Sequence, residues 1–164
     1  MPLLVRKINK GKWNHIDFLA SSDISADALT NDLKTTNNTL SLWQVNNEGE
    51  LDNAILALVA KQDNHETFDV VIFDEAKIYE QQLELQDTPG DTPVKSLIDT
   101  HRDICDLTYS KMGLVKDLIL IELRGDRVRR FTKTYLKALL KRSIENQTLS
   151  ALDINDTLKR KLGL

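Results

Sequence analysis

One segment restricts the fold of this chain more than any other, the hexapeptide FDVVIF at positions 68–73. Its last four residues are all apolar, so a strand here presents hydrophobic side chains to both faces of its sheet. Such a strand is stable when other elements cover both faces. With 164 residues available to build a core, the chain is expected to be a mixed α/β protein.

Strand and helix patterns alternate on the N-terminal side of this segment. Leu3–Ile8 and Leu40–Val45 are predicted strands, because their composition and pattern favour extended structure. Ser25 is predicted to cap a helix, and residues 50–62 are predicted to form an amphipathic helix, since apolar residues recur there at helical intervals. This order predicts a small β-α-β-α-β unit in which at least some strand pairing is parallel.

The segment 81–93 is the expected domain boundary. It is polar and contains a Pro-Gly and a Thr-Pro pair, and proline removes a backbone donor and disfavours helix before it. The chain is therefore divided into a small α/β subdomain at 1–86 and a helical C-terminal subdomain at 94–164. One compact domain is the alternative.

Beyond this boundary the apolar spacing becomes helical. Residues 104–121 are predicted to form one helix, which Gly125-Asp126 would end before capping a second helix through 128–139. The two would form a C-terminal helical hairpin, followed by a short helix over 154–162. The alternative is that LILIEL, at 118–123, forms a strand, because short apolar runs are ambiguous.

Charge is distributed unevenly along the chain. Residues 1–123 contain 11 Lys and Arg against 21 Asp and Glu, a net charge of −10, whereas residues 124–164 contain 11 against 4, a net charge of +7. A basic end of this kind can indicate a polyanionic partner. The alternative is that it packs against the acidic body of the same molecule, or of a second copy in a homo-oligomer.

Cys105 is the only cysteine, so the chain can form neither an intrachain disulfide nor a zinc site built from cysteines. This favours a reducing compartment. The N-terminal residues lack the apolar stretch of a signal peptide, and the longest apolar runs are far too short to cross a bilayer. The expected location is cytoplasmic, away from membranes, and no cofactor is expected.

The candidates for catalysis are Asp74, Glu75 and Lys77, which directly follow the apolar run. Glu-x-Lys is half of a metal-dependent nuclease site, in which carboxylates bind magnesium and the lysine orients water. The second acid would come from one of four aspartates, Asp52, Asp63, Asp69 or Asp74. An ion pair at the surface is the simpler explanation of this motif.

The triplet His101-Arg102-Asp103 also occurs in protein kinases, but Thr108 stands where kinases have asparagine, and the glycine-rich loop is missing. The triplet is therefore predicted to lie in a helix with its charges exposed. His101 and Cys105 would then share a helix face as two metal ligands. Packing of Cys105 in the core of the hairpin is the simpler explanation.

A basic stripe is the candidate binding site. Its members are spaced three or four residues apart, so a continuous helix would carry them on one side: Arg127, Arg130, Lys133, Lys137 and Lys141. Such a stripe can contact successive phosphates of a nucleic acid. The alternatives are an ordinary solvated helix face and a face that pairs with an acidic surface.

These observations favour a non-enzymatic interaction protein that docks a protein partner, such as an accessory subunit, an adaptor or an immunity- or antitoxin-type inhibitor. Charge polarity and the expected helical hairpin both suit docking. The second hypothesis is a nucleic-acid-associated protein that uses the basic stripe. The third is a metal-dependent phosphodiesterase that uses the residues after the apolar run.

Overall fold

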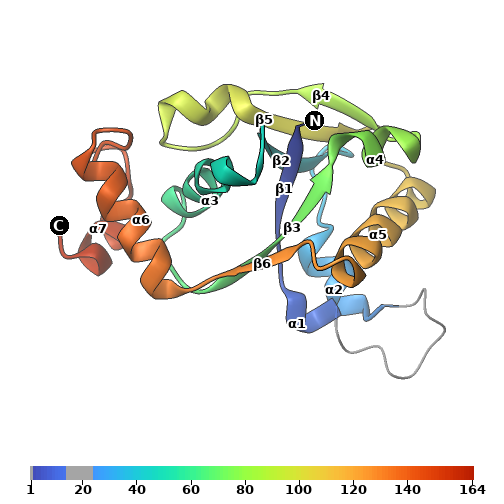
Figure 1. The fold of residues 1–164 in the computed structure, drawn as a ribbon, viewed down its shortest axis with the longest axis horizontal. Helices are drawn as coiled ribbons and strands as arrows, with labels where there is room; N and C mark the ends of the chain where they lie inside the picture. Colours follow the sequence, from blue (N-terminus) through green and yellow to red (C-terminus); the bar gives the residue numbers. More distant parts are fainter. Residues whose placement is uncertain (1, 14–23) are drawn as a thin grey trace.

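The computed structural model describes residues 2–13 and 24–164, and its centre is a six-stranded sheet (Figure 1). The strand order is β4-β5-β2-β1-β3-β6, and every pair of neighbours is antiparallel. The strands are β1 (Leu3–Ile8), β2 (Leu40–Val45), β3 (Phe68–Asp74), β4 (Glu84–Asp87), β5 (His101–Cys105) and β6 (Val128–Phe131).

Helices cover both faces of this sheet. One face packs against α3 (Leu51–Ala60), the 3-10 helix η2 (Lys95–Thr100), α6 (Lys133–Glu145) and α7 (Asp156–Leu162). The other face packs against α1 (Lys10–Trp13), α2 (Ala26–Asp32), α4 (Glu75–Glu80) and α5 (Tyr109–Arg124). A short 3-10 helix, η1 (Glu48–Glu50), leads into α3.

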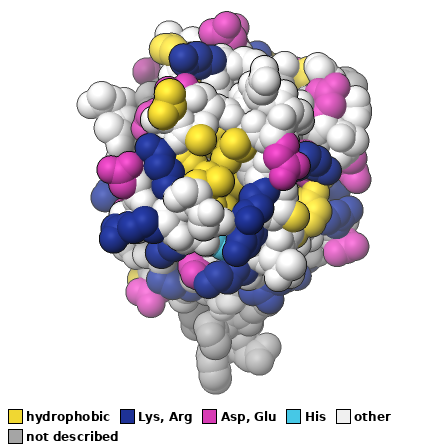
Figure 2. All heavy atoms as spheres, turned by 90° about the vertical axis from the view of Figure 1, so that its left-hand side faces the viewer, with side chains coloured by type: hydrophobic (Ala, Val, Ile, Leu, Met, Phe, Trp, Pro, Cys, Tyr) yellow, Lys and Arg dark blue, Asp and Glu magenta, His cyan; other side chains and the backbone are white. Residues whose placement is uncertain are grey.

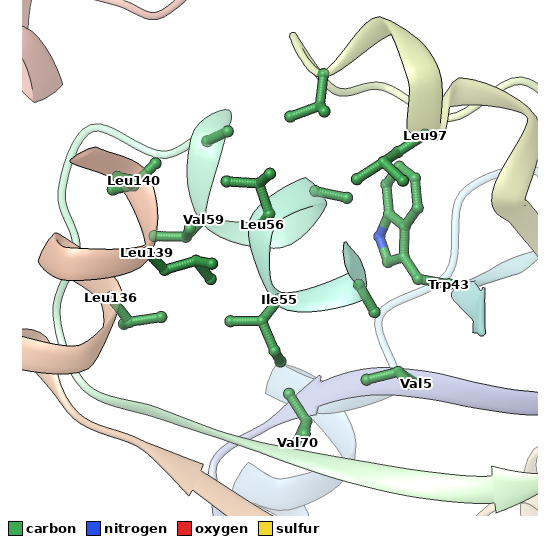
Figure 3. Close-up of a cluster of buried hydrophobic side chains, with 14 of the residues drawn as sticks. Val5, Trp43, Ile55, Leu56, Val59, Val70, Leu97, Leu136, Leu139 and Leu140 are labelled. Carbon is green, nitrogen blue, oxygen red and sulfur yellow. The ribbon is translucent and has the colours of Figure 1, made fainter. Parts of the chain in front are cut away.

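Strand β3 contributes to the cores on both sides. Val70 and Ile72 belong to the core under α3 and α6, whereas Val71 and Phe73 belong to the core under α5. Figure 3 shows the first of these cores, in which Ile55 of α3 lies between the sheet and α6. The prediction of a mixed α/β protein with a doubly covered strand at this position is confirmed, as are the strands at 3–8 and 40–45.

The prediction of parallel pairing is wrong. Strands β2 and β3 do run in the same direction, as expected for two strands joined through a helix, here α3. However, β1 lies between them and is antiparallel to both. The N-terminal strand β1 therefore separates β2 from β3, which the alternation of strands and helices predicts to be adjacent and parallel.

Two segments that were predicted as helix are strands. Residues 101–105 form β5, which pairs with β2 and β4, and residues 128–131 form β6, which pairs with β3. Asp106 (φ 51°) and Asp126 (φ 55°) adopt left-handed backbone, so a tight turn separates each strand from α5. Gly125 ends α5 as predicted, but Asp126 leads into a strand instead of capping a helix.

The two long C-terminal helices consequently do not form a hairpin. Helices α5 and α6 lie on opposite faces of the sheet, and β6 connects them (Figure 1). The alternative strand at 118–123 is wrong, since these residues lie within α5. The short final helix is confirmed as α7, and Ser25 caps α2 by accepting a hydrogen bond from the backbone N–H of Ala28.

The segment 81–93, expected to be a boundary, contains strand β4. Strands from the chain before and after this segment belong to the same sheet. That residues 1–86 and 94–164 fold as separate subdomains stays a prediction. Among the described residues, no helix combines the length and the apolar character needed to cross a membrane.

Candidate functional site

Helix α6 carries a row of lysines along one side. Thr132 caps its start by accepting from the N–H of Tyr135, and its buried residues, Leu136, Leu139, Leu140 and Ser143, lie on the side that packs against α3. Beside that buried side lie Lys133, Lys137 and Lys141, which are all exposed. Because they are four residues apart, their side chains follow one another along the helix. These three members of the predicted stripe are therefore brought together.

The other two members of the stripe lie elsewhere, so the prediction of one continuous helix face is wrong for them. Arg127 precedes β6, and its guanidinium lies 2.7 Å from the carboxylate of Asp74 and 3.2 Å from that of Glu48. Arg130 lies on β6, and its Nε lies 3.2 Å from Oδ1 of Asp69. Both arginines are neutralised by carboxylates of the same chain.

A further helix adds a fourth lysine to the row. We use the term lysine face for Lys133, Lys137, Lys141 and, from α7, Lys161. Lys133 forms an ion pair with Glu66 at 2.8 Å. Within residues 2–13 and 24–164, the other three lysines form no ion pair. Figure 2 views this side of the molecule, where Lys and Arg side chains, with some Asp and Glu side chains among them, lie around a group of hydrophobic side chains.

On the opposite flank of α6, the positive charge of Arg142 is paired with a carboxylate. Asp52 of α3 accepts hydrogen bonds from the Tyr135 hydroxyl and, at 2.7 Å, from Arg142. Burial raises the pKa of Tyr135 to about 12, and both the hydrogen bond to Asp52 and the negative charge of Asp52 contribute to this increase. Uncompensated positive charge on α6 is thus confined to the side that carries the lysine face.

A hollow of about 370 Å³ opens on the lysine face. Six residues line it: His65, Glu66, Lys133, Thr134, Lys137 and Lys161. His65 is only 3% exposed, and its Nδ1 has no hydrogen-bond partner among the described residues. Burial lowers the pKa of His65, and the nearby lysines lower it further. Sequence reasoning missed His65 and Lys161, because they come from a loop and a helix far from the predicted stripe.

A second, larger concavity of about 540 Å³ lies on the part of the sheet that α3 leaves open. Its floor includes Val5, Trp43 and His101 from three adjacent strands, and Leu58 and Lys61 of α3 form one wall. His101 packs edge-on against Trp43, with ring centroids 5.0 Å apart. The predicted position of His101 on an exposed helix is therefore wrong.

A hydrogen-bond chain fixes the imidazole of His101. The hydroxyl of Thr88 donates to Oδ2 of Asp103 at 2.8 Å and lies 2.8 Å from Nδ1 of His101. A carboxylate can only accept, so the single hydroxyl proton is used and Nδ1 must be the donor to Thr88. Nε2 is then left as the acceptor nitrogen of a neutral ring, and burial lowers the pKa of His101.

Arg6 also lines this concavity, but its donors serve the fold. Its Nε donates to the backbone oxygen of Asp32 at 2.9 Å, and its Nη1 donates to that of Ser41 at 2.7 Å. Burial lowers the pKa of Arg6 to about 10, although Asp32 and Asp103 act in the opposite direction. The arginine thus anchors the end of α2 to the sheet.

The catalytic candidates do not converge on one open position. Asp74 pairs with Arg127 at 2.7 Å, as described above. Glu75 pairs with Arg102 at 3.3 Å. Lys77 pairs with the buried Glu122 at 2.7 Å. Arg127 also lies 3.8 Å from Glu122, so Asp74 and Lys77 belong to one network of ion pairs and Glu75 belongs to another.

Cys105 and His101 are also too far apart to share a metal ion. They lie four residues apart on strand β5, which corresponds to about 13 Å. Within the described parts of the chain, one group has the spacing of potential metal ligands, namely Glu84, Cys105 and Asp106. Burial raises the pKa of the Cys105 thiol, and the carboxylates of Asp106 and Glu84 raise it further, which disfavours the thiolate that binds metal.

Comparison with known proteins finds no match: no family model, no curated protein and no solved structure resembles the chain. Function must therefore be inferred from the residues themselves.

Stability should decrease when the pH falls from 7.5 to 5.5. The folded protein holds the pKa of both His65 and His101 below the ordinary value of about 6.5, mainly through burial. Below that pH the unfolded chain binds more protons than the folded one, so the free energy of unfolding falls. Urea denaturation across this range tests the effect. Substituting both histidines by glutamine should flatten the slope, and an unchanged slope would contradict the assignment.

Proposed function

We propose that the protein is a non-enzymatic interaction protein that docks an acidic surface of a protein partner on its lysine face. One observation carries this proposal. Lys137, Lys141 and Lys161 are exposed and have no carboxylate partner in the described chain, whereas Arg127, Arg130 and Arg142 each have one. Carboxylates of a partner would relieve the repulsion among the lysines and fix the orientation of the complex.

The same lysines could contact the phosphates of a nucleic acid, which is the second candidate function. Two observations favour a protein. The chain carries a net charge of −3, which gives little long-range attraction to a polynucleotide. Carboxylates also lie on both sides of α6, at Asp52 and Glu66, and they interrupt the positive surface along which a continuous phosphate backbone would run. A metal-dependent phosphodiesterase has less support, because each of its three candidate residues is already paired with an opposite charge of the same chain.

Reversing the charge of the lysine face should abolish capture of the partner. Tagged wild type, a Lys137→Glu/Lys141→Glu variant and a Lys34→Glu control would be used to capture proteins from a host lysate. Lys34 is an exposed lysine that follows α2, remote in sequence from α6. We expect one protein to be retained by wild type and control and reduced about tenfold or more with the double variant. Equal capture by all three would refute the proposal.

Nuclease treatment of half of each lysate separates the two candidate functions. A protein partner remains bound after digestion. If capture instead disappears after digestion and falls steeply as salt is raised, the lysine face binds nucleic acid.

A further inference from the structure

The hollow on the lysine face has the charge of a site for a doubly charged anion. Lys133 and Lys137 approach it from α6, and Lys161 approaches it from α7. Glu66 is the one carboxylate that lines it, and that carboxylate is bound to Lys133 at 2.8 Å. Three positive charges against one negative charge leave a surplus of two.

His65 supplies a polar group that the fold leaves unsatisfied. Its side chain is 97% buried by the protein, and its Nδ1 has no hydrogen-bond partner among the described residues. A buried nitrogen without a partner destabilises the folded protein. The other ring nitrogen, Nε2, also has no hydrogen-bond partner among the described residues, but the protein does not enclose it. Because His65 lines the hollow, a ligand oxygen seated there would give Nε2 a partner, and this observation is independent of the lysine charges.

The first turn of α6 contributes the positive end of a helix dipole. Thr134, which lines the hollow, is the second residue of this 13-residue helix. Two N–H groups of this turn already have acceptors, since that of Lys133 donates to Thr67 and that of Tyr135 donates to Thr132. The N–H of Thr134 has no partner among the described residues, and anions bind at such groups. The hollow therefore combines a helix N-terminus, three ammonium groups and an unsatisfied imidazole.

We infer that this hollow binds a phosphate monoester and that the partner's anchor on the lysine face is a phosphorylated side chain. A phosphate monoester carries a charge of about −1.5 to −2 at neutral pH, which matches the surplus of two, whereas a carboxylate or a phosphodiester carries −1. The volume of about 370 Å³ accommodates the phosphoryl group with part of the side chain that bears it. The nature of the partner rests on the proposed function, but phosphate binding does not.

Inorganic phosphate is the first probe. It would be titrated at constant ionic strength into isotope-labelled protein, while the amide resonance of Thr134 and the imidazole resonances of His65 are followed. We expect saturable shifts at both residues, and at least about tenfold weaker binding in Lys137→Met and in Lys161→Met. Because both lysines are exposed, the two variants should fold as wild type does, with Lys34→Met as the matched control. Shifts that rise linearly with concentration, or that are equal in all variants, would overturn the inference.

Two further probes identify the source of the phosphate. A short phosphoserine peptide should bind more tightly than the same peptide with serine, and more tightly than a 5′-phosphorylated dinucleotide. Tighter binding of the dinucleotide would overturn the phosphopeptide as the anchor.

The failures of the two proposals are distinguishable. If phosphate binds but reversing Lys137 and Lys141 leaves capture of the partner unchanged, the docking function fails and the phosphate site stands. If phosphate does not bind but capture is lost in that variant, the docking function stands and the phosphate site fails.

Discussion

Replacing Lys77 with methionine should lower the free energy of unfolding by about 3 kcal/mol. The ammonium of Lys77 lies 2.7 Å from Oε1 of Glu122, whose side chain is only 1% exposed. Without Lys77, the buried carboxylate has Arg127 as its remaining cation, with Nε 3.8 Å from Oε2. Glu122 would then either stay charged in the interior or take up a proton, and each of these costs free energy. Guanidinium denaturation at pH 7.5, followed by circular dichroism, measures the loss.

Two controls separate the buried charge from the loss of a lysine as such. A Lys77→Met/Glu122→Leu variant should recover most of the stability, because it leaves no unpaired charge in the interior. Lys61→Met removes the exposed ion pair with Asp91 and should change stability by less than about 1 kcal/mol. If Lys77→Met were as mild as Lys61→Met, the buried ion pair would not stabilise the fold.

The second large effect is expected for Asp32→Ala, which should destabilise the protein by about 3 kcal/mol. Oδ2 of Asp32 accepts from the indole N–H of Trp13 at 2.6 Å and from the backbone N–H of Asn9 at 2.8 Å. Asp32 and Trp13 are 8% and 2% exposed. Alanine would leave the buried indole N–H of Trp13 without its acceptor, whereas the N–H of Asn9, an exposed residue, could bond to water. Urea denaturation gives the loss, and a red shift of tryptophan emission would indicate that Trp13 has become solvated.

The chemistry of position 32 can be tested with two companion variants. Asp32→Asn can place its amide oxygen where Oδ2 lies and accept both hydrogen bonds, but without the negative charge that strengthens them, so about half of the stability loss is expected. Asp27→Ala removes an exposed carboxylate from the first turn of the same helix and should cost less than about 1 kcal/mol. Equal stability of the Asp32→Ala and Asp27→Ala variants would show that the two hydrogen bonds contribute nothing.

The sequence predicts the strands that consist mainly of apolar residues. It does not predict β5 and β6, in which polar residues stand among the apolar ones. Strands β1, β2 and β3 have continuous or alternating apolar residues, and this pattern predicts a strand in each case. In β5, the buried residues His101 and Asp103 satisfy each other through Thr88, a contact that depends on a loop 13 residues upstream. In β6, two arginines stand between the apolar ends. Neither short strand shows the period of two that would distinguish it from a helix.

The order of the strands in the sheet could not be predicted from the sequence either. Local patterns fix which residues are extended, but the insertion of β1 between β2 and β3 is decided by contacts between segments far apart in the chain. The same limit applies to the candidate site. The spacing of Lys133, Lys137 and Lys141 predicts that they share a helix face, because one helix carries them all. His65 and Lys161 join them only through the packing of α7 and the loop before β3.

The distribution of the helices has a consequence for synthesis on the ribosome. The helices of one face, α1, α2, α4 and α5, are complete once residue 124 has been made. The opposite side still lacks α6 and α7, so Ile55 and Val59 of α3 have no cover from Leu136, Leu139 and Leu140. A growing chain that pauses here presents an unfinished apolar surface, which is where aggregation begins and where holdase chaperones bind. The helix that carries the lysine face thus also closes the nascent core.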